Sequence, residues 1–187
     1  INRFPESEQT NSDAYSIYTE YQLWHKLTDY LDLTAGVSEN FSIINSNMYN
    51  DHTGINVAGY TQLEFRPLYR LKAVAGIRLE QNSLDGINDK LVPVLRAGLN
   101  WQAADFTFLR ASFGQGYRYP SIAEKHASTT LGSVTIFPNP EILPESGWSL
   151  ETGVKQGLSF GEITGQIDAS LFMSENINMI EYFLSFY

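Results

Sequence analysis

Residues 31–38 read LDLTAGVS, and they decide the fold because apolar and polar side chains alternate at successive positions. In an extended strand, successive side chains point to opposite faces of the sheet. The four apolar side chains therefore share one face, opposite Asp32, Thr34, Gly36 and Ser38. This stretch predicts a β-strand that separates an apolar environment from a polar one.

The same two-residue period recurs along the chain, and helical spacing hardly appears. Eight candidate strands begin near Ala14, Leu31, Ile55, Leu71, Leu91, Phe106, Gly147 and Gly161. Several run for about ten residues or more, against about 5–6 in soluble proteins and about 9–11 for strands that cross a bilayer. We therefore predict an all-β chain, an antiparallel meander of about eight long strands.

Short and long connections alternate between these strands. Short turns are predicted near Thr28-Asp29, Pro67-Leu68, Ala103-Asp105 and Gly157-Ser159, where Asp, Pro or Gly provides the backbone geometry. Aromatic residues flank the turns and predict a girdle at a membrane interface: Trp24, Tyr30, Phe65, Tyr69, Trp101, Phe106 and Phe160. Short turns at one end and long loops at the other are typical of transmembrane β-barrels.

Composition excludes several classes of function. The 187 residues include 12 basic and 21 acidic side chains, and a formal net charge of −9 argues against nucleic-acid binding. No cysteine is present, which excludes disulfides, Cys-x-x-Cys zinc sites and thiol nucleophiles. The first residues have neither the basic start nor the apolar stretch of a secretory signal, so we expect a mature chain or a piece of a larger one.

No catalytic constellation is found in the sequence. His25, His52 and His126 lie in separate segments, and there is no His-x-x-x-His, Gly-x-Ser-x-Gly or phosphate-binding glycine loop. We therefore expect no catalytic residue, metal site or cofactor.

Three ordered motifs resemble one family. Residues 107–124, TFLRASFGQGYRYPSIAE, resemble the "LRASYGxGFRxPSxxE" segment of TonB-dependent outer-membrane receptors. Residues 138–145, PNPEILPE, are similar to the family's "NPxLKPE" loop, with Leu143 in place of the usual Lys, and residues 148–153 match "WSxExG". The resemblance places these motif residues at the barrel mouth: Arg118, Tyr119, Pro120, Ser121, Glu124, Asn139, Pro140, Pro144 and Glu145.

The resemblance implies a barrel of about 22 strands around an N-terminal plug in the outer membrane of a Gram-negative cell. It also implies import of a scarce ligand (a siderophore, haem, cobalamin or a glycan) with energy delivered by TonB, and no enzymatic activity. Residues 1–187 supply about eight strands and no plug, so we expect a segment of the barrel domain. Its partners would be outer-membrane lipid, the rest of the barrel and its plug, TonB acting through the plug, and the transported ligand.

Charged side chains on the polar face are predicted to face the lumen, because a charge facing lipid costs about 2–4 kcal/mol at mid-bilayer. They are Glu64, Arg78, Glu80, Arg96, Arg110 and Glu151. Each is more often a partner in a cross-strand ion pair than a ligand contact. Ligand contacts are expected in the long loops, where rings and amides suit sugars or chelates: Tyr49, His52, His126 and Phe137.

Two other architectures fit the alternation. A complete eight-stranded outer-membrane barrel would act as an anchor or adhesin. A soluble β-sandwich or lipocalin-like binding module would instead bury the apolar face against a second layer. The three interpretations differ in what covers the apolar side chains.

Overall fold

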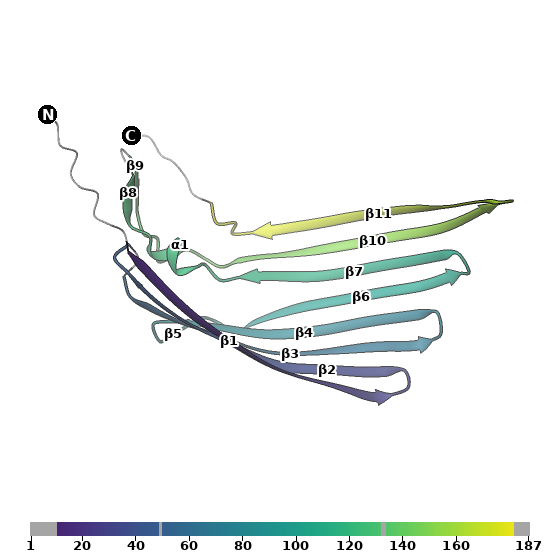
Figure 1. Ribbon diagram of the computed structural model, residues 1–187, viewed down its shortest axis with the longest axis horizontal. Helices are drawn as coiled ribbons and strands as arrows, with labels where there is room; N and C mark the ends of the chain where they lie inside the picture. Colours follow the sequence, from purple (N-terminus) through teal and green to yellow (C-terminus); the bar gives the residue numbers. More distant parts are fainter. Residues whose placement is uncertain (1–10, 49, 132–133, 182–187) are drawn as a thin grey trace.

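The computed structural model describes residues 11–48, 50–131 and 134–181. Eight long strands form one antiparallel sheet (Figure 1): β1 (Ser12–Thr28), β2 (Leu31–Ser46), β3 (His52–Leu68), β4 (Leu71–Leu84), β6 (Val92–Ala104), β7 (Thr107–Arg118), β10 (Glu145–Phe160) and β11 (Ile163–Ile177). The two-residue β5 (Ile87–Asn88) pairs with β4. The long strands pair in chain order, which confirms the predicted meander.

The connection between β7 and β10 contains the other elements. It holds the helix α1 (Ile122–His126) and a small hairpin of β8 (Thr129–Leu131) and β9 (Val134–Ile136). In the part of the chain that the structure describes, no helix is long and apolar enough to cross a membrane.

The four short turns all lie at one end of the sheet and the longer connections at the other (Figure 1). The predicted turns at Pro67-Leu68 and Gly157-Ser159 are wrong, because β3 continues to Leu68 and β10 to Phe160. The chain turns at Tyr69-Arg70 and at Gly161, whose φ is +63°. Gly157 lies within the strand, where a Cβ would come within 3.1 Å of Phe106 Cβ. Gly157 therefore makes room for a neighbouring ring and forms no turn.

The register aligns the predicted faces across all eight strands. One row runs across the sheet through His25, Leu33, Leu63, Ala75, Ala97, Phe113, Leu150 and Met173. The adjacent row pairs Asp32 with Glu64 and continues to Glu151. The sheet therefore has one mainly apolar face and one mainly polar face.

Burial on the two faces is the reverse of that in a soluble protein. On the apolar face, Val37 is 57% exposed and Leu63 43%, whereas Asp32 and Ser38 on the polar face are 7% and 5% exposed. Ala58 is the one buried apolar residue among those described. No second layer covers the apolar face in the described ranges, as a sandwich would require.

The apolar face is nearly as tall as the apolar band of an outer-membrane barrel. On β4 it runs from Leu71 to Leu79 and ends at the exposed Gln81; on β2 it is interrupted by Glu39. The β4 stretch is about 27 Å long at about 3.3 Å per residue, or about 20 Å high for a strand tilted by about 40°, close to the apolar band of about 25 Å on outer-membrane barrels.

The sheet is open along both edges. In the described residues β1 pairs only with β2, and β11 only with β10, so these strands do not close into an eight-stranded barrel. Of the rings predicted to form a girdle, Phe65 and Trp101 lie on the apolar face near the turns. Trp24 was wrongly included, because it lies opposite Thr34 on the polar face.

Candidate functional site

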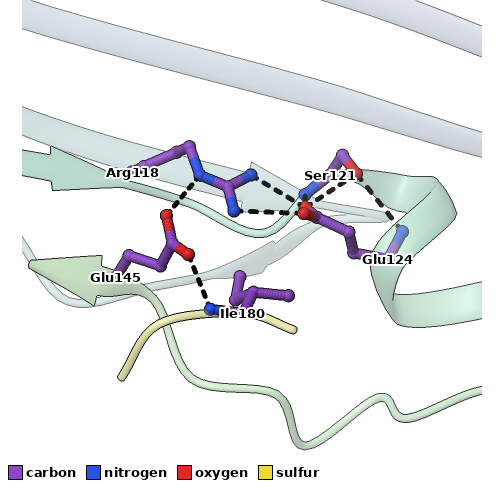
Figure 2. Close-up of polar contacts among 5 residues, drawn as sticks. All are labelled: Arg118, Ser121, Glu124, Glu145 and Ile180. Carbon is purple, nitrogen blue, oxygen red and sulfur yellow. Dashed lines mark hydrogen bonds and ion pairs between the residues drawn. The ribbon is translucent and has the colours of Figure 1, made fainter. Parts of the chain in front are cut away.

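One arginine joins four segments at the long-loop end of the sheet (Figure 2). Arg118 Nε donates to Glu145 Oε2 at 2.6 Å, and its Nη1 and Nη2 donate to the two oxygens of Glu124 at 2.9 and 3.0 Å. Glu145 Oε1 accepts from the amide of Ile180 at 2.6 Å. This Arg118 clasp (Arg118, Ser121, Glu124, Glu145 and Ile180) connects the end of β7, α1, the start of β10 and the segment after β11.

The local sequence explains why the helix begins beside the arginine. Pro120 cannot donate to the sheet ladder and restricts the residue before it to extended backbone, so β7 ends. Ser121 then caps α1: its Oγ accepts from the Glu124 amide at 3.2 Å, while the Glu124 carboxylate accepts from the Ser121 amide at 2.7 Å. Hydrogen bonds from Arg118 outweigh burial and lower the pKa of Glu124 to about 2. The clasp therefore keeps its charges in mild acid.

The remaining motif residues have different surroundings. Tyr119 Oη donates to the Glu80 carbonyl at 3.4 Å, and burial, followed by the charge of Tyr117, raises its pKa to about 12. The Asn139 carbonyl closes a turn, Pro140 is exposed in that turn, and the Pro144 carbonyl accepts from Asn178 at 3.4 Å. The motif thus forms a clasp and its flanking turns, with no group arranged for chemistry.

The sheet divides between β6 and β7 next to this motif, where Figure 1 shows the two strands diverging. Their ladder stops at Arg96 opposite Gly114, and the Leu95 amide is satisfied by Gln115 Oε1 at 3.0 Å. Backbone groups alternate in direction along a strand, so Pro93 faces β7 as Leu95 does but has no N–H to donate. The missing donor at Pro93 means that the ladder cannot resume beyond Leu95 through that residue.

All six charged residues predicted for the lumen lie on the polar face, and five form ion pairs. Glu64 pairs with Arg66 and Lys72 at 3.1 and 2.8 Å, Arg78 with Glu80 at 3.4 Å, and Arg110 with Glu151 at 3.4 Å. Arg96 has no such partner among the described residues; its side chain lies over Gly76, where a Cβ would be 3.3 Å from Nε. These side chains cross-link the wall.

Other polar contacts on this face were not predicted from the sequence. Tyr60 Oη donates to Glu20 Oε1 at 2.5 Å, and its ring covers Gly36 and lies 5.8 Å from the Arg78 guanidinium carbon. The side chains that line a hollow of about 390 Å³ on this face include Glu20, Tyr60, Arg78 and Arg96. At the turn end, Arg66 also holds the buried Asp32. These pairs depend on strand register, which the sequence pattern alone does not define.

Two of the predicted loop residues meet at the long-loop end. The rings of His52 and His126 lie 4.1 Å apart between centroids, tilted by 32°. His52 Nδ1 donates to Asp85 Oδ2 at 2.7 Å, and the Thr53 amide donates to Asp85 Oδ1 at 2.8 Å. His52, Asp85 and His126 are called the histidine cluster below.

The electrostatics of the histidine cluster keep Asp85 charged. Burial acts to raise the pKa of Asp85, but the hydrogen bonds from Thr53 and His52 outweigh it and lower the pKa. The pKa of His126 is lowered by burial first and then by His52. In the described ranges no three His, Asp or Glu side chains are arranged to hold a metal ion.

The other two predicted loop residues are not part of this cluster. Phe137 is 79% exposed, and Tyr49 lies outside the described residues.

Comparison with known proteins agrees with this geometry. A family model described as "TonB dependent receptor-like, beta-barrel" matches residues 2–186, whereas no curated protein matches. The copper transporter OprC is similar in structure, with 18% identity, a TM-score of 0.63 and coverage of 86% of this chain and 30% of that chain.

Two further solved structures have the same fold. One is a mutant haemophore receptor HasR of Serratia marcescens, in complex with the haemophore HasA and haem, with 13% identity, a TM-score of 0.67 and coverage of 89% of this chain and 33% of that chain. The other is the FrpB iron transporter of Neisseria meningitidis, with 13% identity, a TM-score of 0.63 and coverage of 87% of this chain and 28% of that chain. The chain thus spans about a third of the length of these proteins. Because the family model covers nearly the whole sequence, the chain belongs to the β-barrel family of TonB-dependent receptors.

Proposed function

We propose that residues 1–187 form one arc of the barrel wall of an outer-membrane receptor that imports a scarce ligand by TonB-coupled active transport. The observation that carries this proposal is the reversed burial: exposed apolar side chains on one face and, on the other, the buried Asp32 and Ser38 among ion-paired charged side chains. Hydrocarbon stabilises the first face and a polar lumen the second. Other strands of the receptor would pair with the edges of β1 and β11.

In this proposal the polar face lines the lumen beside the plug. The ion pairs of Glu64, Arg78, Arg110 and their partners cross-link neighbouring strands. The Arg118 clasp at the mouth would anchor the loops, and ligand contacts would come from His52, His126, Phe137 and Tyr49. Siderophores, haem, cobalamin and glycans are the candidate ligands; copper, haem and iron appear in the names of the structurally similar proteins.

Adjacent residues on opposite faces provide a direct test of the wall. Leu63 lies on the apolar face and Gln62 on the polar face of β3. In the complete receptor polypeptide, folded into phospholipid vesicles, single Leu63→Cys and Gln62→Cys variants would each carry an environment-sensitive fluorophore. We expect brominated lipids to quench the label at 63 and aqueous iodide to quench the label at 62. Equal quenching at both positions would contradict a lipid-facing wall.

Transport is tested separately in cells. A strain that lacks the gene would be grown with a single ferric siderophore, haem, cobalamin or glycan as the limiting nutrient, with and without the plasmid-borne gene. We expect the gene to restore growth on one of these nutrients only when TonB is present. Growth that is restored equally without TonB would rule out TonB coupling while leaving the barrel assignment intact.

A further inference from the structure

The histidine cluster ties together connections that are distant in the sheet. His52 begins β3, Asp85 lies in the turn between β4 and β5, and His126 ends α1 in the β7–β10 connection. A hydrogen bond of 3.2 Å from the Ser128 amide to the Met48 carbonyl accompanies the ring contact. Because β4 and β6 lie between β3 and β7, sheet pairing does not hold these segments together.

We propose that the histidine cluster is an acid-sensitive latch, which holds the β7–β10 connection against the β2–β3 connection near neutral pH and releases it in mild acid. The latch concerns the conformation of these loops and does not depend on which ligand the receptor carries.

The latch contains one carboxylate for two imidazoles. Asp85 Oδ2 is bonded to His52 and Asp85 Oδ1 to the Thr53 amide, so both oxygens are engaged. A proton added to His126 therefore places a positive charge 4.1 Å from the His52 ring without a bonded carboxylate of its own. When His52 also carries a proton, two like charges share one carboxylate at that separation; they repel, and the rings gain by moving apart.

The charged groups around His126 come from three elements. Asp85 in the β4–β5 turn acts to raise its pKa, while His52 of β3 and Lys125 of α1 act to lower it. Glu124, the one carboxylate of the helix, is engaged by Arg118. Burial is the largest of the influences on His126, and the net effect is a lowered pKa.

The lowered pKa determines the direction of the response. The open loop binds a proton on His126 near the ordinary histidine pKa of about 6.5, and the latched loop binds it only at lower pH. The latch is therefore fully stable above about pH 6.5 and weakens as the pH falls below that value. Linkage to one proton raises the ratio of open to latched molecules by up to about tenfold per pH unit.

The Arg118 clasp determines how the released connection moves. Glu124 remains ionised in mild acid because its pKa is about 2, so the start of α1 stays fixed to β7 and β10. Only the end of α1, at His126, is freed. The connection would then pivot about the clasp and widen the barrel mouth.

The distance between the two connections can be measured directly. Nitroxide labels would be placed at Asp51→Cys and Ala127→Cys in the complete receptor polypeptide in detergent micelles, with any cysteine outside these 187 residues replaced by serine. Double electron–electron resonance at pH 7.5 and pH 5.0 would give the distance distributions. We expect one short, narrow distance at pH 7.5 and a rise in the ratio of long to short distances at pH 5.0, which linkage to one proton limits to about thirtyfold.

Two variants test the role of the titrating ring. His126→Phe keeps a flat ring without a titratable nitrogen, and it should show the same distribution at both pH values, whether latched or open. His25→Gln, at an exposed histidine near the opposite end of the sheet, should respond to pH as the parent does. An unchanged distribution in the parent, or a full pH response in His126→Phe, would overturn the latch without affecting the proposed transport function.

Discussion

Replacing Glu124 by Gln isolates the charge of the Arg118 clasp. A glutamine keeps the size of the side chain and its carbonyl oxygen still accepts from the Ser121 amide, so the capping box survives. The variant loses the ionic part of the paired contacts with Arg118 at 2.9 and 3.0 Å. The substitution therefore tests the ion pair and leaves the helix cap in place.

The expected loss of free energy follows from the lowered pKa of Glu124 and from the exposure of the Arg118 side chain. A fall from the ordinary value of 4.5 to about 2 corresponds to about 3 kcal/mol at full strength. The Arg118 side chain is 47% exposed, so solvent screening reduces this figure to about 1–2 kcal/mol. We expect local opening of α1 to become about 5–30 times more frequent in Glu124→Gln.

Trypsin provides the assay, because Lys125 follows Glu124 directly and is only partly exposed. Cleavage after Lys125 at pH 8 reports the population of the opened helix when opening and closing are fast relative to cleavage. Rates would be divided by those of the two matching free peptides, since the neighbouring residue alters trypsin directly. Glu162→Gln, in an exposed turn, is the matched control and should cleave at Lys125 as the parent does.

The result that refutes this reasoning is equal normalised cleavage in Glu124→Gln and the parent. It would mean that the ion pair drawn in Figure 2 contributes no net stability to the start of α1. The clasp would then be no more than a surface contact of the kind that often contributes little.

Three further predictions concern the wall and its mouth. Gly36→Ala places a Cβ 2.5 Å from the Tyr60 ring that covers it, so it should lower the free energy of unfolding by about 1–3 kcal/mol in urea titrations. Gly59→Ala has no atom within 4 Å of its Cβ, so its free energy of unfolding should be unchanged or higher. The Tyr119 phenol should ionise near pH 12, as measured by the difference in absorbance at about 295 nm between the parent and Tyr119→Phe. The stability that the neutral phenol contributes should therefore persist below pH 10 and be lost as the pH rises towards 12. Ile77→Lys on the apolar face should make the free energy of folding into vesicles less favourable by about 2–4 kcal/mol, whereas Val74→Lys on the polar face should fold as the parent does. Equal free energies of folding for the two variants would contradict the assignment of faces.

Local pattern was sufficient to predict the strands, because the two-residue period records which side of the sheet each residue occupies. It was insufficient wherever a glycine has two possible uses. Gly157 and Gly161 look alike in the sequence, yet Gly161 turns the chain with a positive φ and Gly157 accommodates Phe106 from the neighbouring strand. The distinction depends on register, which is a property of the assembled sheet.

The alternation of apolar and polar residues could not predict the contacts at the long-loop end, for a related reason. His52 and His126 were each assigned to a loop, but their stacking requires the β7–β10 connection to cross strands that are not its neighbours. No periodicity encodes such a crossing. The ion pairs of Arg78 and Arg110 were anticipated only in kind, because their partners depend on the stagger of adjacent strands.

The most specific motif of the sequence turns out to be a structural clasp, and this explains why it identifies a family without identifying a ligand. Arg118 donates three hydrogen bonds here, all to Glu124 and Glu145, and the second oxygen of Glu145 accepts from the Ile180 amide. Groups satisfied in this way hold the loops in position whatever passes between them. In the proposed receptor, selection of a ligand would fall to side chains with fewer internal contacts, such as Arg96, which has no ion pair among the described residues, or the exposed Phe137. Substituting these two residues should alter ligand preference, whereas substituting Glu124 should alter the stability of the mouth.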